Sequence, residues 1–407
     1  MARPSIPVEY QAPPAPGVSL TAASVARANL LRAVGSILGP LIGLVLVFLI
    51  FGAWKPELFL TRDAVENVFR NNYHYAVAAV GATFVIITAG IDLSCGSVMA
   101  LSCVCCALVI RGFSFPTWDV GQAGAIGGGL AIAAGLCGMG RAMQNGATRW
   151  RSAQVGMVAA AAAFVIGFAF WWIVAGHVVR PMPVVVGILA GVLTGAAVGW
   201  VNGALITFLS LPPFIITLAT LEGVRGLALY MTDAIPVSGM PGNIRALHSG
   251  SVLGFPPNVW IAVLVTLAAI PVLHFSVLGR YTYAIGSNER TARLCGVHVE
   301  RWKTICYVIA GATAGLAGVM MCAKFNSAPP DEFKGVELTV IAAVVIGGTS
   351  LFGGEGTVMG SVLGVLMLGF LYTGCNIAQI DTNVQRIFIG GTIVLAAALD
   401  RFRHLAR

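Results

Sequence analysis

Long apolar runs separated by short polar connections dominate this sequence. Segments of about 20 apolar residues are typical of helices that cross a lipid bilayer. Twelve such segments occur, at residues 35–53, 73–91, 95–110, 121–140, 153–176, 184–209, 214–231, 259–277, 304–323, 336–348, 357–375 and 385–399. The pattern predicts an all-α, polytopic transmembrane helical bundle. The third and tenth segments are short for a full crossing, and broken or re-entrant helices there would lower the number of spans from twelve to ten or eleven.

The composition agrees with a membrane protein. Of 407 residues, 57% are hydrophobic and 10% are charged, and the mean hydropathy is +0.88. Soluble domains carry about 25% charged residues because they need a solvated surface. The nine cysteines are odd in number and lie almost wholly within apolar segments, with Cys295 in a polar loop. This distribution argues against a disulfide framework or a structural zinc site.

The positions of the basic residues predict the orientation. Basic residues in short loops are retained on the cytoplasmic side. With twelve spans, residues 141–152, residues 278–303 and the tail after residue 400 lie on one side, and each holds at least three basic residues. Both termini are therefore expected in the cytoplasm. Residues 1–34 form a cytoplasmic, partly disordered segment with an interfacial helix near 18–34, no cleavable signal peptide is evident, and residues 35–407 form the transmembrane domain.

The most informative polar stretch is residues 276–304, which connect two apolar segments. Asn288 is expected to cap a short helix from Glu289 to Val299, with Glu289 at its favourable positive end, and Gly296 to end or bend that helix. Such a helix on a basic loop suits docking of another protein. Ordinary charge retention together with contact to anionic lipid explains the loop equally well.

Charged groups inside apolar segments are costly and mark candidate functional residues. Glu222 and Arg225 lie three residues apart, a spacing that permits an ion pair. A self-neutralised structural pair is favoured over a polar patch near a transport path. Asp92, at a break between two apolar segments, is favoured as the N-cap of a helix starting near Ser94, and a place in the transport path is compatible with that role.

The glycine-rich segment 347–357 superficially resembles a phosphate-binding loop. That loop requires a Gly-Lys pair, and none of the four lysines follows a glycine. We therefore expect no ATP site of this kind on this chain. The six histidines show no metal-ligand spacing, and no catalytic constellation can be assembled, so an enzyme is not expected.

A weak internal similarity links two segments. The chain reads IDLSCGSVMALS after VIITAG, and LFGGEGTVMGSV after VVIGGTS. The two segments would have the same orientation, which favours a parallel repeat. Shared glycine-rich membrane composition remains an equally good explanation.

Four ordered stretches carry a family resemblance. Residues 279–303 read GRYTYAIGSNERTARLCGVHVERWK, which resembles the pattern G-R-x-x-Y-A-I-G-G-N-x-x-A-A-R-x-S-G-I-x-V of ribose/xylose/galactoside-type ABC importer permeases. Departures at Ser287, Thr291, Cys295 and Val297 are conservative in size. Residues 85–101, 211–230 and 337–364 also resemble the family. Residues 112–183 hold about two apolar segments beyond its usual ten spans, which implies an extra helix pair.

The resemblance implies an ABC importer permease fold and a homodimer that moves a monosaccharide or small polyol across a bacterial inner membrane. It also implies a cytoplasmic ATPase carrying ATP and Mg²⁺, an extracytoplasmic sugar-binding protein and surrounding membrane lipid. No cofactor on this chain and no nucleic-acid partner are expected. The candidate ATPase-coupling residues, within 278–303, are Arg280, Gly286, Asn288, Glu289, Arg293, Gly296 and Lys303. The candidate path or gate residues are Asp92, Ser94, Phe214, Thr217, Glu222, Arg225 and Asn326.

Two other functional classes make different demands on the sequence. An ion-coupled secondary transporter should carry acidic residues near mid-span, and Glu222 and Glu337 are its only candidates. An integral-membrane enzyme needs clustered catalytic groups at one interface, and none is seen.

Overall fold

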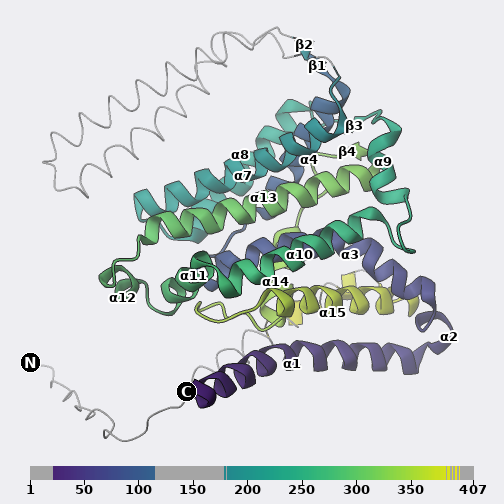
Figure 1. Ribbon diagram of the computed structural model, residues 1–407. Coiled ribbons are helices and arrows are strands. Elements are labelled where there is room, and N and C mark those ends of the chain that lie inside the picture. Colours follow the sequence, from purple (N-terminus) through teal and green to yellow (C-terminus); the bar gives the residue numbers. More distant parts are fainter. Residues whose placement is uncertain are drawn as a thin grey trace, which may run out of the picture.

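The computed structural model describes residues 22–114, 178–179, 181–381 and parts of 383–394. Helices dominate this part of the chain (Figure 1). They are α1 (Ala22–Trp54), α2 (Pro56–Phe59), α3 (Arg62–Ile87), α4 (Cys95–Arg111), α7 (Val184–Leu209), α8 (Pro213–Met231), α9 (Gly242–Ser249), α10 (Pro257–Phe275), α11 (Val277–Ser287), α12 (Glu289–Leu294), α13 (Val299–Phe325), α14 (Val336–Ile346) and α15 (Val358–Ile377). Two short antiparallel pairings join β1 (Phe113–Ser114) to β2 (Val178–Val179), and β3 (Val237–Ser238) to β4 (Ser327–Ala328).

The helices confirm a helical membrane protein. Within the described residues, α7, α8, α10, α13 and α15 are long and apolar enough to span a bilayer. Nine of the twelve predicted apolar segments coincide with helices. The predicted segments 121–140 and 153–176, and with them the expected extra helix pair, lie outside the described residues, as does most of 385–399. The pairing of β1 with β2 brings together the two ends of residues 112–183, the range in which the extra helices are expected.

Helix α13 lies at the centre of the bundle, in contact with α3, α4 and α7 (Figure 1). Glycine recurs every fourth residue along α7, at Gly187, Gly191, Gly195, Gly199 and Gly203. A Cβ atom at Gly195 would meet the Gly311 carbonyl oxygen and lie 2.8 Å from the Gly315 Cα on α13. The two backbones therefore touch, which only small residues permit.

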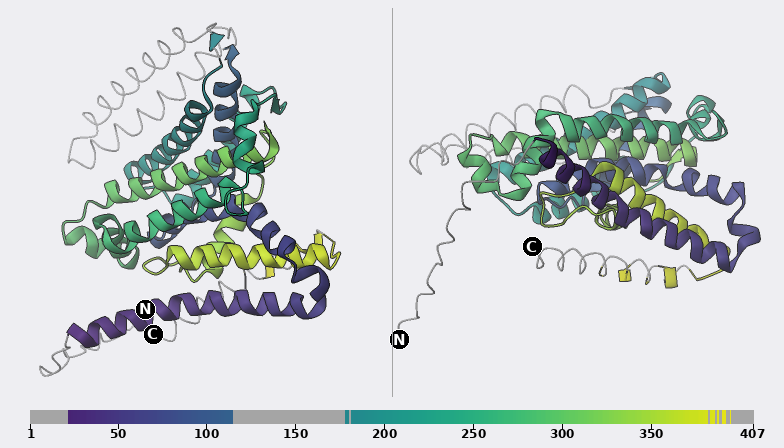
Figure 2. Two further views of the ribbon diagram at one scale, coloured as in Figure 1. Left: turned by 45° about the vertical axis from the view of Figure 1, so that its right-hand side comes forward. Right: turned by 60° about the horizontal axis from the view of Figure 1, so that its bottom comes forward.

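On the other side of α3, the bundle continues through α15 to α1 (Figure 2). Aromatic rings join the far end of α1 to its neighbours. The Phe48 ring lies 5.5 Å from that of Phe59 and 5.6 Å from that of Phe370, measured between centroids. Such tilted and edge-on arrangements are favourable for aromatic pairs, and they anchor α1 against α15.

The starts of two helices, α3 and α1, differ most from the sequence prediction. Helix α3 begins at Arg62, eleven residues before the predicted start at 73, because the Thr61 hydroxyl caps it by accepting from the Ala64 N–H at 3.2 Å. Its charged first turns are stabilised by an ion pair from Glu66 to Arg70. Helix α1 is continuous from Ala22 to Trp54, so the described part of 18–34 is not a separate helix.

The helices α4 and α14 are short, as the sequence predicted. With a rise of about 1.5 Å per residue, the 17 residues of α4 span about 25 Å and the 11 residues of α14 about 16 Å. The hydrocarbon core of a bilayer is about 30 Å thick. Helix α14 is therefore a half-helix, and the buried Glu337 of its first turn lies against Gly96 of α4.

Candidate functional site

The segment from 276 to 303 holds two short helices, α11 and α12, at one end of the bundle, and continues into α13 (Figure 1). The Asn288 side chain accepts a hydrogen bond from the Thr291 N–H at 2.9 Å, which confirms the predicted N-cap of α12. Helix α12 ends at Leu294, and Gly296 has a φ of +82°, a left-handed conformation that favours glycine. Helix α13 begins at Val299, so the predicted long loop is largely helical.

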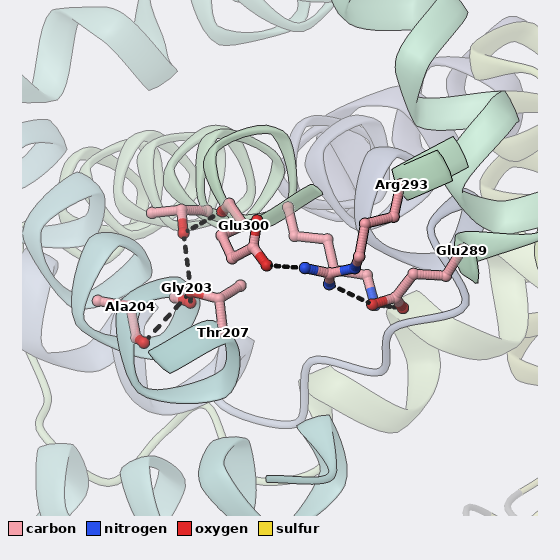
Figure 3. A network of polar contacts seen from close by, with 8 residues as sticks. Gly203, Ala204, Thr207, Glu289, Arg293 and Glu300 are labelled. Atoms are coloured by element: carbon pink, nitrogen blue, oxygen red, sulfur yellow. Dashed lines mark hydrogen bonds and ion pairs between the residues drawn. The ribbon is translucent and has the colours of Figure 1, made fainter. Parts of the chain in front are cut away.

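Ion pairs hold α12 against the first turn of α13 (Figure 3). The Glu289 carboxylate accepts from Lys303 Nζ at 2.6 Å and from Arg293 Nη2 at 3.3 Å. The Arg293 guanidinium also pairs with Glu300. Exposed pairs of this kind contribute about 1 kcal/mol or less each. They therefore fix the position of α12 more than they stabilise the fold.

The electrostatics of this cluster favour the charged form of Glu289. Partial burial alone would raise the pKa of its carboxyl group. Hydrogen bonds and charges from Lys303 and Arg293 outweigh burial and hold the pKa of Glu289 below its ordinary value. The ion pairs are therefore intact at neutral pH.

A polar groove of about 650 Å³ lies between this cluster and the connection from α7 to α8. On the α7 side, the Thr207 hydroxyl lies 3.4 Å from that of Thr304 on α13 (Figure 3). The groove is lined by Ile206, Thr207, Ser210, Leu211, Pro212, Pro213, Glu289, Arg293, Val299, Glu300 and Lys303.

A buried hydrogen-bond network surrounds the break between α3 and α4. Asp92 Oδ1 accepts from the Ser94 N–H at 2.9 Å and from its hydroxyl at 2.6 Å. Asn202 Nδ2 of α7 donates to the Ser94 hydroxyl at 2.9 Å, and Thr220 of α8 donates to Asn202 Oδ1 at 2.6 Å. The predicted role of Asp92 is corrected in one respect, because Ser94 is the N-cap residue of α4 and Asp92 orients it.

The glycine-rich segment 347–357 packs against the same break and against α11. The Gly354 N–H donates to the Ile87 carbonyl oxygen at 2.8 Å. The Tyr283 hydroxyl of α11 donates to the Gly356 carbonyl oxygen at 2.6 Å. Burial raises the pKa of Tyr283 to about 12, so the hydroxyl remains a donor. Both predicted similar segments therefore meet at one end of the bundle, whereas the parallel repeat itself stays a prediction.

At Gly286, the backbone of α11 lies against this helix break and against the glycine-rich segment. A Cβ atom there would meet the Ile87 carbonyl oxygen and lie 2.5 Å from the Gly354 nitrogen. Both neighbours are backbone atoms with little freedom to move. The α11–α12 segment thus rests directly on the break between α3 and α4 and on the glycine-rich segment between α14 and α15, with no side chain at Gly286 to separate the backbones.

The predicted pair of Glu222 and Arg225 is wrong. Among the described residues, no ion pair joins them. Arg225 is buried, with 8% of its surface exposed and an unpartnered Nε, whereas Glu222 is exposed. Residues three apart differ by about 60° around a helix, and the boundary between the buried and exposed faces of α8 runs between them.

The remaining candidate residues are spread over the molecule. The Thr217 hydroxyl is buried and donates to the Ile91 carbonyl oxygen at 3.2 Å, beside the Asp92 network. Phe214 is half exposed and Arg280 is exposed. Asn326 ends α13 with a φ of +52°, and its Oδ1 is buried without a partner. Only Asp92, Ser94 and Thr217 of the candidate path residues are brought together.

Sequence reasoning missed Asn202, Thr220 and Tyr283 as members of these networks. Asn202 is a single amide within an apolar run, and that isolation was the available signal. Glu337, weighed only for ion coupling, is buried with an unpartnered Oε2. Within the described residues, no group of three or more His, Cys, Asp or Glu side chains is arranged to hold a metal ion.

Comparisons with known proteins show which family and which relatives this chain resembles. The family model described as "Branched-chain amino acid transport system / permease component" matches residues 129–397. The D-allose transport system permease protein AlsC of Escherichia coli (strain K12) is 31% identical, over 88% of this chain and 89% of its own length. The ribose import permease protein RbsC of Bacillus subtilis (strain 168) is 32% identical, over 89% and 92% respectively. No solved structure matches the chain significantly.

Proposed function

Because this chain belongs to the family of monosaccharide ABC importer permeases, we propose that it is the membrane subunit of an ATP-driven importer in a bacterial inner membrane. Its substrate is a monosaccharide or a similar small polyol, in keeping with relatives named for D-allose and ribose. ATP and Mg²⁺ bind to a separate cytoplasmic ATPase, and an extracytoplasmic sugar-binding protein delivers the substrate. Both termini lie in the cytoplasm.

The observation that carries the ATPase proposal is the placement of α12. This helix lies outside the main bundle, with Leu294 at its end 88% exposed. Its cap at Asn288 and its ion pairs to Lys303 and Glu300 define its position. An exposed helix joined by ion pairs to a long membrane helix is suited to receive force from a docked partner.

Movement of α12 can be transmitted through α11 to two helix breaks. One lies between α3 and α4, and the other is the glycine-rich segment between α14 and α15. Helix α11 follows α10 and contacts the backbone of both breaks through Gly286 and Tyr283. One of these breaks carries Asp92 and its network to α7 and α8. We therefore expect closure of the ATPase to shift these breaks and switch the permease between its inward- and outward-facing states.

A second copy of the chain completes the transport path in this proposal. Helix α8 leaves Gly223 and Gly226 facing open space, and its Phe214 and Glu222 are exposed. Leu193 of neighbouring α7 is 65% exposed. An exposed face that mixes apolar, small and charged residues is better suited to a partner than to lipid alone, since a charge facing lipid is costly.

Co-purification of the ATPase tests the coupling role. We expect Glu289→Lys, which places a cation beside Lys303 and Arg293, to abolish co-purification of the ATPase from membranes. Gly296→Pro should do the same, because proline cannot adopt the positive φ of Gly296. Glu57→Lys makes the same charge change on exposed α2 and should leave the ATPase bound. Normal co-purification with both loop variants, inserted at wild-type level, would refute the assignment of α12.

Buried carboxylates favour one second candidate, an ion-coupled secondary transporter of a small polar solute. Glu337 and Asp92 are both buried in the bundle, and such groups bind or relay ions in many transporters. Glu222, the other acidic candidate, is exposed and so weakens this alternative. The energy source of transport separates the two functions.

A further inference from the structure

A second pocket lies beside α12, apart from the polar groove. Its volume is about 250 Å³. It lies where the connection after α12 meets α11 and the first turns of α13. Its lining residues are Tyr281, Gly296, Val297, His298, Arg301, Trp302 and Ile305. None of these residues lines the polar groove or takes part in the ion pairs of Glu289.

The basic residues around α12 and the start of α13 fall into two groups, one facing the polar groove and one facing the second pocket. Arg293 and Lys303 are committed to glutamates on the groove side. Arg301 is exposed, and within the described residues it takes part in no ion pair. His298 is exposed beside it at the start of α13. The second pocket therefore presents the Arg301 guanidinium, His298 and a helix N-terminus, all of which favour an anion.

The walls of this pocket have the character of a membrane interface. The rings of Tyr281 and Trp302 lie 5.0 Å apart between centroids and form one wall. Tyrosine and tryptophan are enriched where membrane helices leave the lipid, because their rings are apolar with a polar edge. Ile305 lies one turn deeper along α13 than Arg301 and is 39% exposed. The pocket thus lies between the exposed apolar side chain of Ile305 and a basic surface.

We propose that this pocket binds the phosphate headgroup of an anionic phospholipid. Arg301 and His298 contact the phosphate, the two aromatic rings pack against the glycerol region, and the acyl chains cover Ile305. This inference rests on the proposed function, which places the α11–α12 segment on the cytoplasmic side. The bound lipid would also contact Gly296 and Val297, the connection between α12 and α13, and so help to fix the position of α12.

Lipid titration of the purified full-length chain, followed by native mass spectrometry, tests the proposal. We expect phosphatidylglycerol to bind more tightly than phosphatidylcholine. Arg301→Gln should weaken phosphatidylglycerol binding about five-fold, because a basic residue near a membrane surface contributes about 1 kcal/mol. Arg290→Gln removes an exposed arginine of α12 outside the pocket and should bind as the wild type does. A Trp302→Ala variant should also weaken binding of phosphatidylglycerol.

Three outcomes would overturn the lipid proposal. These are equal loss of binding in the Arg290 and Arg301 variants, equal affinity for both phospholipids, and equally tight binding of inorganic phosphate, which would indicate a soluble anion. The measurement needs neither the ATPase nor transport. Its failure is therefore distinguishable from failure of the proposed function, which depends on co-purification of the ATPase.

Discussion

At the scale of single residues, Gly286 connects the α11–α12 segment to the core of the bundle. Its hydrogen atoms face the Ile87 carbonyl oxygen and the Gly354 nitrogen, and no side chain fits between these backbones. Its neighbour Tyr283 adds a hydrogen bond to the Gly356 carbonyl oxygen. The contact joins the expected ATPase-docking segment to both helix breaks.

We expect Gly286→Ala to uncouple ATP hydrolysis from transport. The added methyl group must push α11 away from the Ile87 carbonyl oxygen. The ATPase should still co-purify, because α12 and its ion pairs are unchanged, whereas ATP-driven uptake should fall at least ten-fold. Ser287→Ala alters the next, exposed residue, whose hydroxyl donates to the Tyr283 carbonyl oxygen within α11, and it should transport normally because it adds no atom at the backbone contact. Wild-type uptake by Gly286→Ala would contradict a direct backbone junction.

Local spacing predicted some of these residues and could not predict others. The cap at Asn288 depends on an amide only three residues away, so the local sequence was enough to predict it. The contact between Ser94 and Asn202 joins residues 108 positions apart, and only the packing of α4 on α7 creates it. The Glu222–Arg225 prediction failed because spacing does not reveal which face of a helix is buried.

At the scale of helices, the glycines of α7 determine how closely the central elements pack. Apolar run length predicted the existence of most described helices, because hydrophobicity is a property of each segment alone. It did not predict the start of α3, where a threonine cap and an ion pair extend the helix beyond its apolar run. Nor did it predict the contact of Gly195 with Gly311 and Gly315, which depends on which helix lies opposite.

Gly195→Ala should destabilise the bundle by about 1–3 kcal/mol, the usual cost of overpacking. The new methyl group would meet backbone atoms of α13, which cannot rotate away. Gly223→Ala places the same group on α8 with no atom within 4 Å. In a monomeric micelle preparation, where α8 has no partner copy, that control should be neutral or stabilising by up to about 1 kcal/mol, since alanine favours helix. Unfolding in detergent micelles measures both, and equal stability of the two variants would contradict the close packing of α7 on α13.

At the scale of the whole molecule, the basic residues predict the orientation in the membrane, and the exposed thiol of Cys295 can report on it. Cys295 is exposed at the end of α12, whereas the other described cysteines are buried or half-buried. The end of the bundle whose short loops carry more basic residues is expected on the cytoplasmic side. The α11–α12 segment and the helix breaks lie at that same end.

A membrane-impermeant maleimide should label Cys295 from the cytoplasmic side of sealed vesicles. Inside-out vesicles should therefore react and right-side-out vesicles should not. Cys295→Ser should remove this labelling, which shows that no other cysteine accounts for it. Labelling of Cys295 only in right-side-out vesicles would reverse the predicted orientation and place α12 beyond the reach of a cytoplasmic ATPase.

The energy source of transport tests the central claim most directly. The chain would be reconstituted in proteoliposomes with its ATPase and sugar-binding protein, and uptake of radiolabelled monosaccharides would be measured. We predict uptake that requires ATP hydrolysis and both partners, and that persists when proton and sodium gradients are collapsed. Uptake by this chain alone, driven by an ion gradient and independent of ATP, would contradict the account and establish a secondary transporter.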